Sequence, residues 1–113
     1  TMKANFKQQG DSINYVPSAD VAAGEVVVQN DLVAIAKLDI KSGELGALAT
    51  SGVFSIPKAS GEGEGILAGK KVYWDESSSL ATDDEAAGAN KLIGKAIAAA
   101  ASDDEAVLVR LSQ

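Results

Sequence analysis

Hydrophobic and polar residues alternate along most of the chain with a period of two, which is the pattern of β-strands that bury one face. The clearest case is residues 32–40, where the pattern predicts a strand with one wholly apolar face. That face consists of Leu32, Ala34, Ala36, Leu38 and Ile40. The other strands predicted from short apolar runs cover residues 12–16, 25–29, 44–49, 53–56, 70–75 and 107–111.

The residues between these strands are typical of turns and loops. Pro17 and Pro57 each end a strand, because proline has no backbone N–H to donate to a neighbouring strand. The glycine-rich stretch over residues 58–69 predicts a loop. In the strand that follows this loop, Val72 and Trp74 share one face.

The alanine-rich part of the chain near its C-terminal end carries two conflicting signals. Thr82 followed by Glu85 has the spacing of a helix capping box, and the stretch after it has high helix propensity. Two glycines and an asparagine interrupt that stretch, however, and every earlier segment is strand-like. We therefore expect a loop with room for one helical turn over residues 82–90, a strand over residues 91–100 and an acidic turn at residues 102–104.

Together these elements predict an all-β fold, either a compact barrel or a sandwich, with short turns and little helix. The pattern leaves a jelly roll and a smaller barrel equally open. A chain of 113 residues holds one domain, because a second core needs roughly another 100 residues. We expect that domain to span residues 10–113, preceded by an N-terminal arm or edge strand over residues 1–9. No apolar run approaches the roughly 20 residues of a membrane helix, so no membrane partner is expected.

Two amino acids are missing from the composition, and their absence removes most kinds of catalytic and metal site. The chain has no cysteine, which excludes disulfides, thiolate metal sites and a cysteine nucleophile. It has no histidine, the usual general base near neutral pH and the commonest metal ligand. We therefore expect no catalytic residues, no cofactor, no metal site and no small-molecule substrate.

The charge balance argues against nucleic acid as a partner. Asp and Glu number 16 against 10 Lys and Arg, a net charge of −6, and such a surface repels phosphate backbones. Acidic clusters at residues 75–76, 83–85 and 103–105 are expected to be charged surface turns rather than cation sites. A near match to the phosphate-binding P-loop at residues 65–71 lacks the spacing and the following helix of that motif, so a turn is expected there.

Trp74 is the chain's lone tryptophan, and such a residue usually belongs either to a core or to a contact surface. The core is favoured, because Val72 shares its face and few other large side chains fill the interior. An exposed Trp74 beside Asp75 and Glu76 would instead favour an alternative, a small carbohydrate-binding or hydrolytic β domain.

Six short stretches along the chain match one pattern in order and spacing. The two most specific are GVFSIPK at residues 52–58 and GKKVYWD at residues 69–75. The others are AGEVV at 23–27, IKSGE at 40–44, NKLIGKA at 90–96 and VLVRL at 107–111. On these stretches, which span nearly the whole chain, the sequence resembles the phage capsid cement proteins, also called head decoration proteins.

The resemblance implies a compact, decoration-protein-like β fold and a structural virion protein without catalytic residues. It further implies a homotrimer on the exterior of a phage or prophage capsid, made in the host cytoplasm, which clamps neighbouring capsid subunits after the shell expands. The major capsid protein is then the expected partner. A tail or baseplate interaction module is a further alternative.

The N-terminal arm is the segment expected to share in the capsid contact. Residues 2–9 are polar, end at a glycine turn and contain Phe6 flanked by Lys3 and Lys7. Such an arm can add a strand to the sheet edge of a neighbour, although an edge strand of its own sheet is an equal alternative. With Trp74 as the remaining candidate, the expected partner-contact residues are Lys3, Phe6, Lys7 and Trp74.

Overall fold

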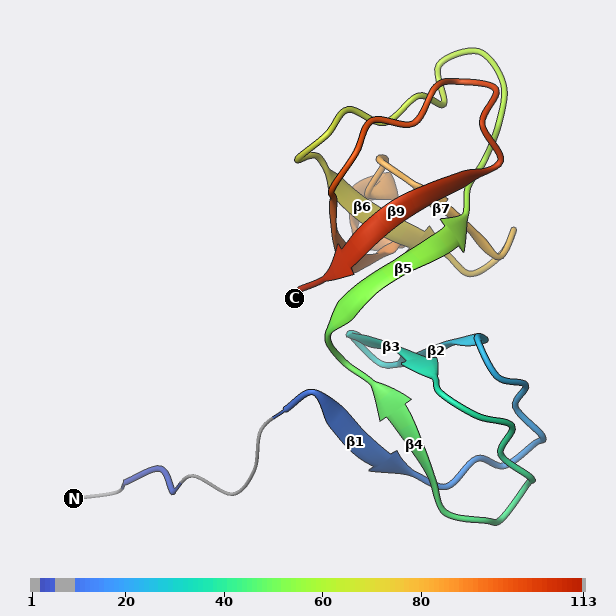
Figure 1. Ribbon diagram of the computed structural model, residues 1–113, viewed down its shortest axis with the longest axis vertical. Helices are drawn as coiled ribbons and strands as arrows, with labels where there is room; N and C mark the ends of the chain where they lie inside the picture. Colours follow the sequence, from blue (N-terminus) through green and yellow to red (C-terminus); the bar gives the residue numbers. More distant parts are fainter. Residues whose placement is uncertain (1–2, 6–9, 113) are drawn as a thin grey trace.

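The computed structural model describes residues 3–5 and 10–112 and shows an all-β molecule built from two antiparallel sheets (Figure 1). The first sheet takes its strands from the first half of the chain. They are β1 (Ser12–Tyr15), β2 (Val26–Gln29), β3 (Leu32–Ala36) and β4 (Gly46–Ala49). Their spatial order, β1-β4-β3-β2, is that of a Greek key, because three consecutive strands are neighbours and β1 lies beside β4.

The second sheet follows in the chain and has five strands. They are β5 (Gly52–Pro57), β6 (Lys71–Asp75), β7 (Leu80–Thr82), β8 (Lys91–Ala96) and β9 (Ala106–Leu111), in the spatial order β5-β9-β8-β6-β7. Just beyond β5, Lys58 forms a bridge with Ala81 of β7, so the two edges of this sheet approach each other at that end. The predicted all-β class is confirmed, as two sheets consistent with a sandwich.

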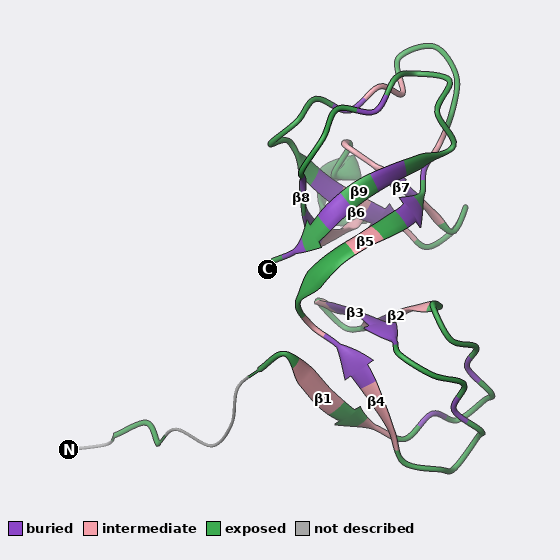
Figure 2. Cartoon of the chain, viewed as in Figure 1, coloured by how far each residue is buried: buried purple, intermediate pink, exposed green. Residues whose placement is uncertain are grey.

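A hydrophobic core joins the two sheets through β3. Val33 and Ile35, on one face of β3, belong to a cluster made mostly of side chains from the second sheet. Ala34 and Ala36, on the other face, belong to a smaller cluster with Leu48 of β4. β3 is therefore covered on both faces (Figure 2). Burial on both faces is the reason that this strand is a nearly continuous apolar run.

The prediction of a strand over residues 32–40 with a single apolar face is wrong in length and in burial. β3 ends at Ala36, and Leu38 is 75% exposed. Ile40 is buried, but it pairs through an isolated bridge outside the strands. The Asp39 carboxylate accepts a 2.8 Å hydrogen bond from the loop before β2 and so holds a bend in the chain. Alternation alone does not show where a strand loses its partner.

The alanine-rich segment follows the loop and strand that we predicted, with four corrections. In place of the expected helical turn, η1 (Ala86–Gly88) is a tight turn with positive φ angles at all three residues. The strand after it, β8, ends at Ala96 rather than Ala100, which pairs with Ile66 instead. The capping box does not form, because Thr82 accepts a hydrogen bond from the N–H of Asp84 at 3.2 Å. β7 was not predicted, since three residues are too few to display alternation.

The remaining predicted strands all form, and their ends differ from the prediction by at most two residues. Residues 58–69 form the predicted loop, crossed by two isolated bridges. Among the described residues, no helix is long and apolar enough to cross a membrane.

Candidate interaction surfaces

Trp74 lies in β6 with 7% of its surface exposed, and it belongs to the core cluster that joins the sheets. Val72 is buried on the same face of the strand, whereas Lys71 is exposed. The expectation that Trp74 fills the core is confirmed. Its role as a partner contact stays a prediction.

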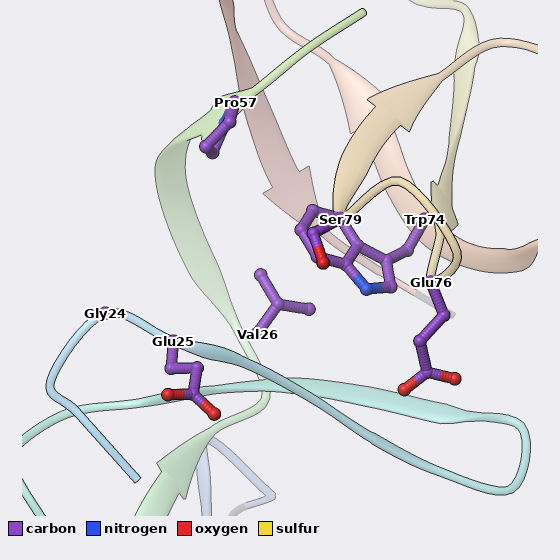
Figure 3. Close-up of a pocket in the computed structure, with 7 residues that line it drawn as sticks. All are labelled: Gly24, Glu25, Val26, Pro57, Trp74, Glu76 and Ser79. Atoms are coloured by element: carbon purple, nitrogen blue, oxygen red, sulfur yellow. The ribbon is translucent and has the colours of Figure 1, made fainter.

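One edge of Trp74 lines an open pocket of about 410 Å³ between the start of β2 and the turn after β6 (Figure 3). Val26 lies at the centre of this pocket, and the carboxylates of Glu25 and Glu76 lie on either side of it. Glu25 accepts a hydrogen bond from the backbone of Ala22 at 3.3 Å and so closes its own turn. The charged groups of the pocket are therefore acidic.

Trp74 is only 7% exposed and belongs to the core, so it gives the pocket no exposed aromatic platform. Sugar-binding sites usually stack a sugar ring on an exposed aromatic face. The carbohydrate-binding alternative required an exposed Trp74 beside Asp75 and Glu76, and the structure does not provide it.

The three acidic clusters predicted to be surface turns hold their own turns by hydrogen bonds. The carboxylate of Asp75 accepts bonds from the backbone N–H and the hydroxyl of Ser77, at 3.0 and 2.7 Å, and the hydroxyl bond is the main reason that the pKa of Asp75 is lowered. Asp84 and Asp104 each accept a backbone N–H at 2.8 Å. Within the described part of the chain, no three acidic side chains gather in a way that could hold a metal ion.

Lys58 is buried, with 2% of its surface exposed, and it is not among the residues predicted to form a site. Its amine donates hydrogen bonds to the carbonyls of Ala59, Ser102 and Asp104, at 2.6, 3.4 and 3.0 Å. Its backbone N–H donates to the carbonyl of Glu105 at 2.9 Å. This lysine ties the glycine-rich loop to the acidic turn. No local signal marks it, because Ser102 and Asp104 come from a distant part of the chain.

A different polar contact, at the surface, links the two sheets. The amine of Lys91 in β8 lies 2.8 Å from the carboxylate of Asp31 in the turn between β2 and β3. The hydrogen bond from Lys91 is the main reason that the pKa of Asp31 is lowered. Exposed pairs of this kind contribute little to stability, so the sheets are held together mainly by their shared core.

Of the four predicted contact residues, the structure describes Lys3 and Trp74. Lys3 is exposed in the short described segment at residues 3–5, whereas Trp74 is buried in the second sheet. Phe6 and Lys7 lie outside the described residues. The contact role of the arm therefore stays a prediction.

These features define the class of the protein as a small all-β scaffold. In the described chain, the buried Lys58 and the turn carboxylates hold the loops of this scaffold. A family model described as phage cement protein matches residues 7–111, and the chain belongs to this family. Nothing among the curated proteins or the solved structures matches it.

The family match confirms the resemblance seen in the sequence. The phage cement proteins are a structural family without enzymatic activity, and membership implies that the chain binds the capsid and helps to stabilise it. The expected location is then the capsid of the virion.

Proposed function

We propose that the chain binds the outside of a phage head as a trimer and clamps neighbouring major capsid subunits. The observation that carries this proposal is the family match, because residues 7–111 include both sheets and every described strand. The whole described fold is thus the part that corresponds to a cement protein.

Clamping by a small protein requires many weak contacts that act together. Multiple linked sites turn modest affinities into firm attachment, because each further contact forms at a high effective concentration. A trimer presents three identical surfaces to the shell. Closed symmetry also gives partners to sheet edges such as β1 and β5, which would otherwise stay open to unwanted pairing.

The proposal includes a division of the chain into an arm, residues 1–9, and one β domain, residues 10–113. The core that joins both sheets through β3 supports a single domain. The polar composition of residues 2–9 supports an arm that is free to reach the capsid.

The test is binding to expanded empty heads of the parent phage. We expect the protein to have the mass of a trimer by light scattering and to sediment with the heads in a saturable ratio. A protein that ignores heads but associates with purified tails or baseplates would replace the capsid role with a role in the tail.

Deletion of residues 2–9 tests the arm separately. If the arm shares in the capsid contact, the shortened protein should stay folded and trimeric but bind heads at least tenfold more weakly, as the loss of one anchoring contact predicts. The circular dichroism spectrum of the shortened protein controls for its folding. Undiminished binding would remove the arm from the interface.

A further inference from the structure

Three cations form a row on the outer face of the second sheet. Lys71 of β6 lies opposite Lys95 of β8, and Lys95 lies opposite Arg110 of β9. All three are exposed, and among the described residues none of them has an ion pair or a side-chain hydrogen bond. Like charges directly opposite each other destabilise a sheet. The stability of the sheet therefore gives no reason for three cations to stand side by side.

Exposed apolar side chains lie beside this row. Val53 of β5 continues the row beside Arg110, and the N–H of Ile97 bonds to the carbonyl of Leu108, which places these two side by side. Val53, Ile97 and Leu108 are 51%, 50% and 43% exposed. We call this surface the basic face. It consists of Lys71, Lys95, Arg110, Val53, Ile97 and Leu108.

Acidic residues are absent from the strands that build most of this face. β5, β8 and β9 contain no Asp or Glu, although the chain holds 16 of them. The acids that share a pocket with Lys71 are Asp83 and Glu85, at the β6 edge of the face. In a chain of net charge −6, the basic face is thus a local reversal of charge.

The opposite charge gathers at the other end of β9. There the glycine-rich loop and the turn before β9 lie side by side, joined by a 2.7 Å hydrogen bond from Gly61 to Ser102 (Figure 1). Glu62, Asp103 and Glu105 are exposed on these loops, while Lys58 is buried beneath them. We call these three acids and Asp104 the acidic tip.

The acidic tip also contains a hollow. An open depression of about 720 Å³ lies between the two loops, and it is lined mainly by glycines, alanines, Ile66 and Leu67. Leu67 is 70% exposed. The tip therefore combines four acids, of which Asp104 lines the hollow, with an open apolar depression, whereas the basic face combines a row of cations with exposed branched side chains.

The two surfaces are complementary, but they cannot meet within one chain. Arg110 stands near one end of β9 and Glu105 just before the other end, a separation of about 17 Å along an extended strand. A second copy of the chain can bring the two together. Copies with net negative charge repel each other in most orientations. The face on β5, β8 and β9, whose strands carry no acid, gives one orientation in which opposite charges attract.

We propose that the basic face of one copy binds the acidic tip of the next copy. Ile97 and Leu108 pack against the hollow, and Lys95 and Arg110 face the acids of the tip. Two different surfaces meet in this contact, so it is heterologous and closes into a ring when the rotation between copies permits. The inference rests on the proposed function, because it supplies the contact by which a cement trimer would form.

Charge-reversal variants test this contact. The face variant carries Lys95→Glu and Arg110→Glu, the tip variant carries Glu62→Lys and Asp103→Lys, and the swap variant carries all four. We expect the wild type to have three times the monomer mass of 11.5 kDa by light scattering at low salt. The face and tip variants should fall to the monomer mass. The swap variant should return to the trimer, because it restores opposite charges between the four substituted positions and has the net charge of the wild type.

Two controls separate the contact from general charge effects and from misfolding. Lys37→Glu with Lys41→Glu changes the net charge as much as the face variant does, on exposed lysines of the first half of the chain, and should leave the trimer intact. Thermal unfolding followed by circular dichroism should show that every variant is folded.

Three results would overturn the contact. They are a monomeric wild type, a face variant that stays trimeric, and a swap variant that stays monomeric although folded. A trimeric face variant that no longer sediments with heads would assign the basic face to the capsid instead. Head binding is measured separately, so a trimer that forms by this contact but ignores heads would contradict the proposed function and leave the contact standing.

Discussion

At the scale of single residues, the charged side chains that most resemble catalytic or binding groups stabilise the fold. Lys58 is buried against three backbone carbonyls, and Asp75, Asp84 and Asp104 accept hydrogen bonds from their own turns. A buried charge is costly unless hydrogen bonds compensate it, and here backbone carbonyls do so without a carboxylate partner. These residues therefore fix the conformation of the loops, and their hydrogen bonds indicate no reaction.

Replacing Lys58 tests its role directly. We expect Lys58→Met to lower the free energy of unfolding by about 1–3 kcal/mol, because three carbonyls lose a charged donor. The measurement is urea unfolding, with Lys37→Met, at an exposed site, as the control that should change stability by less than about 0.5 kcal/mol. Equal effects of the two substitutions would show that the buried bonds contribute nothing net.

Ser77→Ala should raise the pKa of Asp75 towards its ordinary value of 3.8, because the hydroxyl of Ser77 is the main group that lowers it. A lowered pKa in the folded state means that this bond stabilises the fold above the ordinary pKa. That stabilisation is lost as pH falls through the folded value. NMR titration of the carboxyl carbons measures the shift. The pKa of Asp31, which Lys91 lowers, should stay unchanged in the same spectra.

At the scale of the elements, a close approach of two strands determines the shape of the second sheet. The register between β6 and β8 shifts at Val72 and Tyr73, and Gly94 of β8 lies against the backbone of β9. A Cβ atom on Gly94 would lie 1.9 Å from the carbonyl oxygen of Arg110. The irregular pairing there requires a residue without a side chain.

We expect Gly94→Ala to destabilise the protein by about 1–3 kcal/mol or more, because the strands must separate to accept the methyl group. The matched control is Gly10→Ala, where nothing lies within 4 Å of the added Cβ. Thermal unfolding of both variants checks the prediction. A Gly94 variant as stable as the control would mean that β8 and β9 adjust freely.

At the scale of the whole molecule, the two sheets share one core, although each sheet takes its strands from a separate half of the chain. Val33 and Ile35 of β3 pack among side chains of the second sheet. These two side chains of the first sheet are buried against the second sheet. The two halves should therefore unfold together, in spite of their separation in sequence.

Coincident unfolding of the two sheets is the measurable consequence. The fluorescence of Trp74 reports on the second sheet, and the NMR methyl signals of Leu48 report on the first. We expect both signals to change at the same urea concentration, as in a two-state transition. Val33→Ala should move both midpoints together. Separate midpoints would divide the chain into two domains.

The sequence by itself determined the class of fold and most of the strands. A strand shows alternate residues to opposite faces, so the pattern at Val107, Val109 and Leu111 is enough to place these side chains inside. The same alternation placed Trp74 in the core. The missing cysteines and histidines removed most catalytic chemistry, and the order of six short stretches indicated the family that the comparison confirmed.

The features that depend on pairing between distant segments were decided only by the tertiary structure. The end of β3, the existence of β7 and the burial of Lys58 each depend on partners far away in the chain. The row of Lys71, Lys95 and Arg110 exists because the register of three strands sets these residues opposite one another. Register is a property of strand pairs, and no local pattern in one strand carries it. The folded sheet is therefore where the basic face first becomes visible.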